Sequence, residues 1–375
     1  MFSATGGCKE SPWQLWNSYS ARFIDLKSGR VFDPNGDQNT TSEGQAYALF
    51  FALAANDRPA FNAVLAWTEA NLASGDLQTH LPAWLWGKNK DGQWKILDSN
   101  SASDADVWMA YTLIEAGRLW KSSGETNLGR AMLALIAKNE VVNLPDFGPM
   151  LMPGPAGFQH GNKWILNPSY LPLFLFKRLA NVDPAGPWAQ IALGIPRLLE
   201  QSSRHGYAMD WVEYVPGDGF YPAPKPTAAE QNPSDTAGPE GSYDAIRVYL
   251  WAGMIDPGDA MRPRILNAVP AMSAYLADHD APPERISDQS MPVTQDGPVG
   301  FSAAVLPYLR AYPDLSKAIA KQMIRLSAQK DAATGLYGKG IAYYDQNLAL
   351  FATGFLDAKF RFGSGGELKV DWKRR

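Results

Sequence analysis

Cysteine and clustered histidine are the scarcest features of this sequence. Cys8 is the only cysteine in 375 residues, so neither an intramolecular disulfide nor a cysteine-rich metal site can form. The four histidines stand far apart, with no HExxH or similar spacing, at His80, His160, His205 and His279. That scatter argues against a catalytic zinc ion. We therefore predict a protein with no metal site and no cofactor.

Long apolar runs and an excess of basic charge are also absent. No run of roughly 18 apolar residues occurs, so the sequence predicts no transmembrane span. The first residues lack the basic and apolar segments of a secretory leader. That leaves either a cytoplasmic protein or a mature one whose leader has been removed. The formal net charge of -4 gives no positive field for polyanions, so nucleic acid is not a predicted partner.

Aromatic residues, by contrast, are abundant. Thirteen tryptophans are a rich supply for this length, and tryptophan is favourable where both its ring and its N–H are used. Two interpretations stay open from composition, a large tryptophan-rich core or a cleft that stacks flat faces such as pyranose rings. With 46% hydrophobic and 19% charged residues, the chain belongs among folded globular proteins.

Helical spacing of apolar residues dominates the chain, whereas signals for strands are sparse. Twelve helices are predicted, at about 10–25, 42–57, 59–74, 103–122, 125–139, 168–181, 185–202, 242–254, 259–276, 301–312, 314–328 and 342–356. They form close pairs, and the Pro/Gly-rich segment 216–241 is predicted as a long loop between helices. This organisation predicts an all-α fold in a single domain, residues 1–375. Its predicted shape is a closed ring of six inner helices wrapped by six outer ones.

Acidic residues mark the predicted starts of alternate helices, which would be the inner ones of such a ring. Glu43 opens the helix at 42, Asp104 and Asp106 open the helix at 103, and Asp244 opens the helix at 242. A carboxylate at a helix start also caps free N–H groups and offsets the helix dipole, which suffices to explain any single acid. Capping does not explain why the longest, most aromatic loops lead into the same helices. The predicted ring gathers these acids at one end.

Two of these acids have unlike predicted surroundings, as glycoside hydrolysis requires. Glu43 precedes an apolar run, where desolvation would favour its protonated form. Asp244 stands three residues before Arg247 in an apolar context, so a buried ion pair would keep Asp244 ionised. The alternative is a surface pair worth roughly a few tenths of a kcal/mol. Asp104 is interpreted as a group that holds sugar hydroxyls, in preference to a ligand of a divalent cation.

Aromatic side chains near these acids are predicted to form the sugar-binding surface, although some of them must simply be core. Together with Arg247, the predicted substrate-binding residues are Trp84, Trp86, Trp108, Tyr170, Tyr243 and Tyr344.

At these residues the sequence resembles glycoside hydrolase family 8. The stretch ASDADVWMAYTLIEAGRLW, from Ala102 to Trp120, is close to the signature of that family and departs from it only at Thr112. The segments TTSEGQAY, LPAWLWGK, NPSYLP, SYDAIRVYLW and GPVGFSAA resemble, more narrowly, the periplasmic members encoded with bacterial cellulose synthase. The resemblance runs from about Trp13 to Trp372.

The resemblance implies an (α/α)6 barrel, an open substrate cleft and inverting endo-hydrolysis of β-1,4-glucan. By motif, Glu43 is the proton donor, Asp244 is the base that activates water, and Asp104 is an essential acid that binds and distorts the sugar. Tyr344 is predicted to help hold the water. Inversion predicts that the carboxyl groups of Glu43 and Asp244 lie roughly 6.5–9.5 Å apart. The resemblance further implies a periplasmic or secreted protein, with cellulose, cello-oligosaccharides and the cellulose synthase export machinery as partners.

Three alternatives remain open. The substrate could be another β-1,4-linked polymer, chitosan or xylan, because one scaffold serves several chemistries. The chain could also be a non-catalytic glucan-binding component of the export apparatus, although the three intact acids count against this. A ring of the terpene-cyclase kind would need acid clusters that bind Mg²⁺ or a central DxDD acid, and neither is evident in the sequence.

Overall fold

The computed structural model describes residues 13–226, 238–289 and 295–373, and helices dominate these ranges. The α-helices within them are α1 (Gln14–Phe23), α2 (Ser42–Ala54), α3 (Arg58–Leu72), α4 (Ser103–Trp120), α5 (Ser123–Asn139), α6 (Leu173–Val182), α7 (Trp188–Ser202), α8 (Ala245–Met254), α9 (Arg262–Ala268), α10 (Ala271–Asp278), α11 (Val299–Leu309), α12 (Ser316–Ala328) and α13 (Tyr343–Leu356). None of the helices in these ranges is both long and apolar enough to cross a membrane. Cys8 and the first residues of the helix predicted at 10–25 lie outside the described residues.

Six helices form an inner ring, and most of them are buried nearly all round; α6 is the exception, with Lys177 and Arg178 partly exposed. Every residue of α8 and of α11 is buried, and α2 is buried from Gly44 to its end; a helix without a polar face has to lie inside the protein. The outer helices bury only a stripe. In α12 this stripe is Ala318, Gln322 and Leu326, spaced four residues apart.

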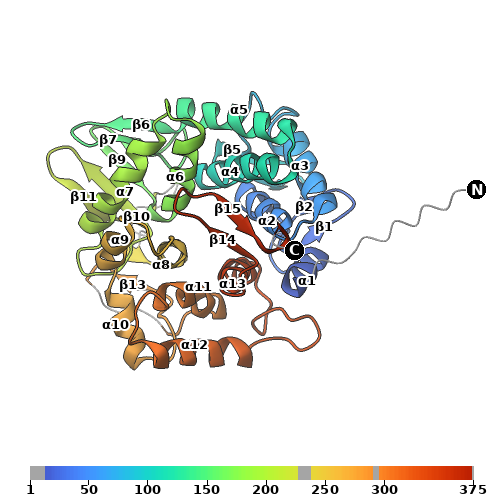
Figure 1. Ribbon diagram of the computed structural model, residues 1–375. Coiled ribbons are helices and arrows are strands. Elements are labelled where there is room, and N and C mark those ends of the chain that lie inside the picture. The colour runs from blue at the N-terminus through green and yellow to red at the C-terminus, as the bar shows by residue number, and fades with distance from the viewer. Residues whose placement is uncertain (1–12, 227–237, 290–294, 374–375) are drawn as a thin grey trace, which may run out of the picture.

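The inner helices follow one another around the ring in the order α2, α4, α6, α8, α11 and α13, as the colours of Figure 1 trace. The last helix closes the ring onto the first, since the Phe351 ring of α13 lies 4.6 Å from Phe51 and 5.0 Å from Tyr47, both on α2. Helices α3, α5, α7, α9, α10 and α12 lie outside, and α1 completes the outer layer beside α13. The predicted (α/α)6 barrel is confirmed.

Two predicted helices differ from the observed ones, and proline is the reason in both. The helix predicted at 259–276 is divided into α9 and α10 at Pro270, and the one predicted at 168–181 begins as a 3₁₀ turn, η1 (Pro168–Tyr170), before α6 starts after Pro172. Proline lacks an N–H and forces the preceding residue out of the helical conformation. Accordingly, Val269 and Leu171 both have non-helical backbone angles.

Short strands, which the sequence analysis largely missed, form six antiparallel sheets in the described chain. They are β1 (Ile24–Asp25), β2 (Arg30–Val31), β3 (Thr40–Thr41), β4 (Ala83–Lys88), β5 (Trp94–Ser101), β6 (Val141–Leu144), β7 (Gly148–Leu151), β8 (Gln159–His160), β9 (Lys163–Leu166), β10 (Trp211–Val215), β11 (Gly219–Ala223), β12 (Glu240–Gly241), β13 (Ile286–Ser287), β14 (Phe360–Phe362) and β15 (Leu368–Val370). The loop predicted at 216–241 thus contains β11 and β12, and its residues 227–237 lie outside the described ranges.

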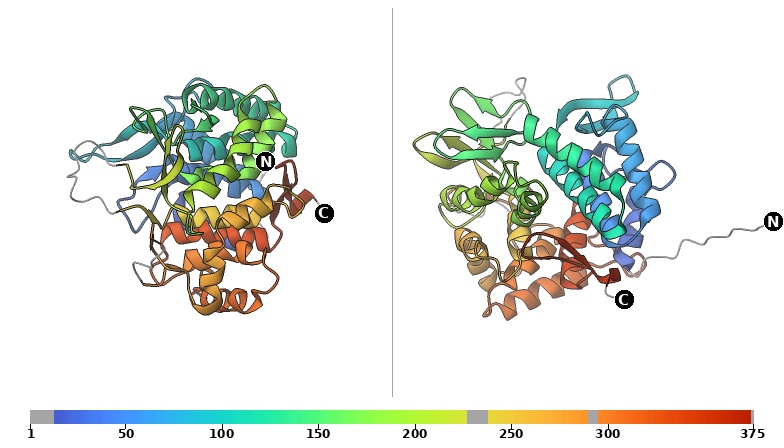
Figure 2. Two further views of the ribbon diagram at one scale, coloured as in Figure 1. Left: turned by 90° about the vertical axis from the view of Figure 1, so that its left-hand side faces the viewer. Right: turned by 45° about the horizontal axis from the view of Figure 1, so that its top comes forward.

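The position of these strands matters for the site. β3 runs directly into α2, β5 ends two residues before α4, and β12 ends shortly before α8. Sheets therefore surround the end of the ring at which the inner helices begin, and the left-hand view of Figure 2 shows strands gathered on one side of the helices. The β14–β15 hairpin instead packs near the end of α4, where the Leu368 N–H donates to Glu115.

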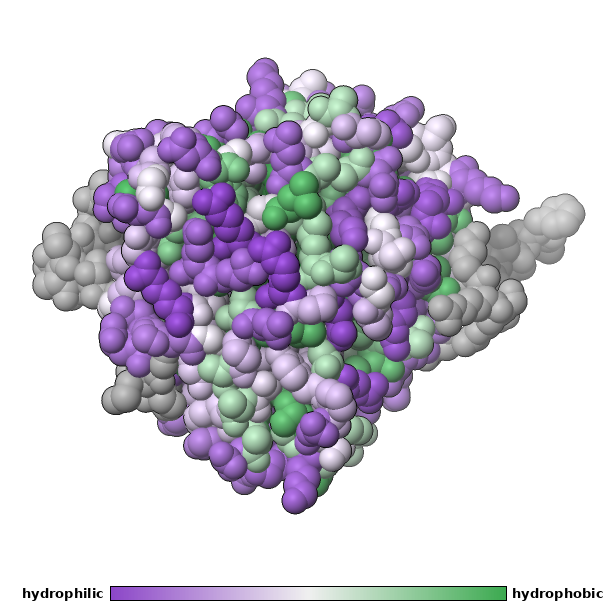
Figure 3. All heavy atoms as spheres, turned by 60° about the vertical axis from the view of Figure 1, so that its left-hand side comes forward, coloured by the Kyte–Doolittle hydropathy of each residue, from purple (hydrophilic) through white to green (hydrophobic). Residues whose placement is uncertain are grey.

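The surface contrasts with this apolar interior. On the face drawn in Figure 3, hydrophilic side chains predominate and apolar ones appear in small groups between them. The hydrophobic side chains instead form one continuous core through the ring, which includes Trp16, Trp108 and Trp188, each almost fully buried.

Candidate active site

One arginine brings the three predicted acids together. Arg247 of α8 donates through Nη1 to Glu43 Oε2 of α2 and, at 3.2 Å, to Asp104 Oδ2 of α4. Its Nη2 lies 2.5 Å from Asp244 Oδ1, and its Nη1 lies 3.0 Å from the Tyr47 hydroxyl. The sequence predicted only the contact between Arg247 and Asp244. The structure therefore assembles Glu43, Asp104 and Asp244, from the starts of three inner helices, around one guanidinium group.

The acids differ in burial. The Asp104 side chain is 4% exposed, whereas those of Glu43 and Asp244 are each 26% exposed. Burial raises the pKa of Asp104 well above its usual range, the nearby Glu43 charge raises it further, and Arg247 opposes both effects. The sequence predicted that desolvation would fall on Glu43. Of the three acids, Asp104 has the most deeply buried side chain, and the sequence analysis did not single it out for desolvation.

Capping does not account for Glu43 or Asp244. The start of α2 is capped by Thr41, whose hydroxyl accepts the Gly44 N–H at 3.1 Å. Asp244 precedes α8 but makes no side-chain cap. A residue that sequence reasoning missed, Asp210, accepts the N–H groups of Ser242 and Ala245, each at 2.7 Å. Two other residues therefore bind the free N–H groups, which leaves both carboxylates available to a ligand.

Asp210 also belongs to the electrostatics of the site. Its burial, reinforced by the Asp244 charge, raises the pKa of Asp210 to about 7. It lies just before β10, in a stretch with no helix start and no recognisable motif. No signal in the sequence distinguishes it from the many other acids of the chain.

Two predicted tyrosines lie beside the carboxylates. The Tyr170 ring is 5.7 Å from the Arg247 guanidinium, and the Tyr344 hydroxyl donates to the carbonyl of Tyr243 at 2.5 Å, one residue before Asp244. Burial raises the pKa of Tyr170 and of Tyr344 well above the usual range, so both stay neutral and can donate hydrogen bonds. Tyr243 itself is 45% exposed, and its hydroxyl donates to Glu284 at 2.8 Å.

Trp108 corrects the prediction of a sugar-binding tryptophan on α4. Its side chain is 1% exposed, and its ring lies 4.9 Å from Phe50, 5.1 Å from Phe351 and 5.4 Å from Trp251. A ring enclosed in this way cannot stack on a sugar, so Trp108 is part of the core. A helix that is apolar all round gives no indication of which aromatic residues face the site.

Trp84 and Trp86 lie on β4, in the sheet that leads into Glu43. Both are partly exposed, and Trp86 pairs with Thr40 across the sheet. The Trp86 ring stacks on Trp94 with ring centres 4.8 Å apart, and the Arg30 guanidinium lies 4.6 Å from it. This aromatic group is outside the ring of helices, in the three-stranded sheet whose strand β3 leads into α2.

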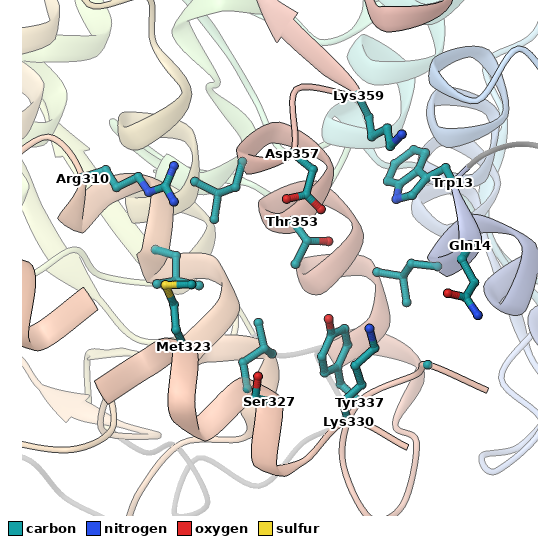
Figure 4. A pocket seen from close by; sticks show the side chains of 15 residues that line it. Trp13, Gln14, Arg310, Met323, Ser327, Lys330, Tyr337, Thr353, Asp357 and Lys359 are labelled. Carbon is teal, nitrogen blue, oxygen red and sulfur yellow. The ribbon is translucent and has the colours of Figure 1, made fainter. Parts of the chain in front are cut away.

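A cavity of about 390 Å³ lies elsewhere, between α1, α11, α12 and α13, as Figure 4 shows. Its lining includes Trp13, Arg310, Met323 and Thr353, and none of the predicted site residues. The described part of the chain contains no group of three or more His, Cys, Asp or Glu side chains that could hold a metal ion. Carboxyl groups such as Glu43 and Asp244 can act as general acids and bases.

Known proteins share this sequence and fold. The family described as Glycosyl hydrolases family 8 matches residues 1–357. An endoglucanase of Xanthomonas axonopodis pv. citri is 45% identical over 365 residues, which cover 96% of this chain and 90% of the relative. An endoglucanase of Salmonella typhi is 42% identical over 373 residues, covering 99% and 94%. The crystal structure of an endo-1,4-D-glucanase from Vibrio fischeri matches with a TM-score of 0.83 at 36% identity, covering 96% of this chain and 99% of that one.

Fold, carboxylates and relatives together define a glycoside hydrolase. The chain belongs to glycosyl hydrolase family 8. The predicted family is confirmed, and so is the predicted enzyme class, since these relatives are endoglucanases.

Proposed function

We propose that this enzyme cleaves β-1,4-glucan chains internally, with inversion at the anomeric carbon. The observation that carries the proposal is the set of three carboxylates held by Arg247, two of them partly exposed and neither used as a helix cap. Two carboxyl groups that flank the scissile bond are the chemistry of glycoside hydrolysis. The names of the relatives, endoglucanase and endo-1,4-D-glucanase, support a 1,4-linked glucan as the substrate, and we propose the β-linked glucan cellulose as its natural form.

In this mechanism Glu43 protonates the leaving glycosidic oxygen, and Asp244 takes a proton from the water that attacks the sugar. Arg247 supports the second role, because its Nη2 lies 2.5 Å from Asp244 Oδ1 and so orients that carboxyl group. Asp104 lies in hydrogen-bonding range of Glu43. We infer that these two carboxyl groups hold one proton between them, which the more exposed Glu43 delivers. Asp104 also binds and distorts the sugar at the cleavage point.

The aromatic residues have different proposed roles. Tyr170 acts as a neutral donor to the sugar hydroxyls, and Tyr344, whose hydroxyl hydrogen is donated to the Tyr243 carbonyl, orients the water by accepting a hydrogen bond through its oxygen. Trp84, Trp86 and Tyr243 are partly or largely exposed, and we propose that they stack on sugar units away from the cleavage point.

Inversion is tested by the stereochemistry of the product. Cleavage of a cello-oligosaccharide followed by proton NMR is expected to give a new reducing end that starts in the α configuration. A β product would mean retention, and would require Asp244 or Asp104 to act as a nucleophile. Glu43→Gln is expected to abolish turnover but to keep oligosaccharide binding, with Glu200→Gln, a surface variant on α7, as the matched control. Turnover by Glu43→Gln at the control rate would refute its role as the acid.

The substrate is tested by comparing carboxymethyl-cellulose, xylan and chitosan in one reducing-sugar assay. We expect the glucan to be preferred, and a preference for xylan or chitosan would replace it. No release from any of the three would favour a glucan-binding component without activity. We further propose that residues 1–375 form one catalytic domain that acts in the periplasm or outside the cell, beside the cellulose synthase export machinery.

A further inference from the structure

A second pair of carboxyl groups lies behind the active site. Asp106 belongs to the first turn of α4, two residues after Asp104, and Glu140 follows the last residue of α5. Both side chains are fully buried and lie in hydrogen-bonding range of each other. The Ser101 hydroxyl donates to Glu140 Oε1 at 2.5 Å.

This pair lacks donors when both groups are carboxylates. Neither Asp106 oxygen, nor Glu140 Oε2, accepts a hydrogen bond from the described residues, because the Ser101 hydroxyl, which lies near both acids, gives its one hydrogen to Glu140 Oε1. The groups that act on the pair from its surroundings are the Asp104 carboxylate on α4 and the Ser101 hydroxyl on β5, and no described cation pairs with either acid. Two adjacent buried anions without a cation are strongly unfavourable, since each costs several kcal/mol to remove from water. One shared proton removes one charge and supplies the missing donor.

The pair connects the elements that hold Asp104. Ser101 ends β5, Asp106 lies in α4, and the Glu140 carbonyl accepts the Met152 N–H at 2.7 Å, just after β7. The Ser103 N–H, next to Asp104, donates to the Pro153 carbonyl at 3.0 Å. Loss of the proton would place two like charges against the first turn of α4, on which Asp104 depends for its position.

We propose that Asp106 and Glu140 share one proton, and that this proton-linked pair positions Asp104 in the active site. Asp106 and Glu140 are thus positioning residues, which act through Asp104 and do not touch the sugar. The part of this proposal that concerns positioning rests on the proposed role of Asp104. The shared proton does not depend on that role, and it can be measured without an activity assay.

Burial of the two acids determines whether the stability of the folded protein rises or falls with pH. It raises the pKa of Asp106 well above its usual range and that of Glu140 to about 7, whereas both acids have pKa values of about 4 in an unfolded chain. Between about pH 4 and pH 7 the folded protein therefore binds more protons than the unfolded one. Stability therefore falls as pH rises through this window, and the fall continues above pH 7 for as long as the folded pair keeps its proton.

The shared proton is tested by counting protons released on unfolding. Asp106→Asn with Glu140→Gln keeps the shape of the pair and replaces the shared proton with permanent N–H donors. Asp91→Asn, in an exposed turn, is the matched control. From the dependence of the unfolding midpoint on pH between 5 and 7, we expect the double variant to release about one proton fewer than wild type, and the control to match wild type. Equal proton release in the double variant would overturn the proposal.

The positioning role is tested by kinetics across the same pH range. Asp106→Asn is expected to keep kcat within about threefold of wild type at neutral pH and to shift the alkaline loss of activity. Asp106→Ala, which offers no donor, is expected to lose at least tenfold in kcat with KM little changed. Equal kcat values for the two variants, each folded by thermal unfolding, would refute positioning. If Asp104→Asn were fully active while the proton count held, the role of Asp104 would fail and the shared proton would stand.

Discussion

Arg247→Lys tests whether the forked geometry of the guanidinium, and not only its charge, organises the active site. Arg247 contacts Glu43 and Asp104 through one nitrogen and Asp244 through the other. A lysine keeps the positive charge but has a single nitrogen on a flexible stem, so it cannot reach both partly exposed carboxylates at once. The change should therefore release Glu43 or Asp244 from its position.

The size of the expected fall in kcat/KM depends on how many of these hydrogen bonds a lysine fails to form. Arg247 is 2% exposed, so water cannot take the place of the missing donor. A hydrogen bond to a charged group contributes about 1.5–3 kcal/mol. Loss of one such bond in the transition state corresponds to a fall in kcat/KM of about 10- to 150-fold, since roughly 1.4 kcal/mol is a factor of ten in rate. Loss of two would exceed roughly a hundredfold on the same scale, even at the lower energy for each bond.

The assay is kcat and KM on a soluble cello-oligosaccharide, with thermal unfolding of each variant to establish that it is folded. Arg264→Lys is the matched control, because Arg264 also contacts a carboxylate, Glu200, but on the exposed surface of the outer layer. The control should match wild type. A folded Arg247→Lys enzyme with kcat/KM within twofold of wild type would show that charge alone suffices, and would refute the bridging role.

Three further predictions concern the residues around this group. Gly44→Ala should reduce kcat at least tenfold in a folded enzyme, because the added Cβ would lie 2.5 Å from the Tyr343 hydroxyl and displace the turn that carries Glu43; unchanged kinetics would contradict the contact. Trp108→Ala should cost about 3–5 kcal/mol of stability in urea unfolding, whereas Trp86→Ala should mainly raise KM for long oligosaccharides, and the reverse pattern would restore Trp108 as a binding residue. Glu115→Gln should lower stability by about 1.5–3 kcal/mol in the same assay, because the buried group that accepts from Arg118 and Arg178 loses its charge; a loss under about 1 kcal/mol, the range of an exposed pair, would refute this.

The ring of helices could be predicted because its signal is repeated many times in the sequence. Most inner helices are apolar on nearly all sides and the outer helices on one, so errors in one helix do not change the architecture. The strands could not be predicted in the same way. β5, with the sequence WKILDSNS, is largely exposed and polar, so it lacks the alternation that marks a half-buried strand.

The site was predictable only as far as helix starts determine it. The starts of alternate helices predict that Glu43, Asp104 and Asp244 share one end of the ring. The contact of Arg247 with Glu43 joins residues 204 apart in sequence, and no local pattern encodes it. The prediction for Trp108 was wrong for a related reason, since spacing along a wholly buried helix does not indicate which ring faces the ligand.

At the starts of α2 and α8, one residue binds the free N–H groups and a different residue carries the carboxylate of the candidate site. The beginning of a helix attracts negative charge through its free N–H groups, and an acid that capped these groups would be held away from a ligand. Here Thr41 caps α2 and Asp210 binds the N–H groups at the start of α8. Glu43 and Asp244 keep the favourable field of the helix ends while their oxygens turn to Arg247. The same acids that looked like ordinary caps in the sequence are therefore free for chemistry because neighbouring residues perform the capping.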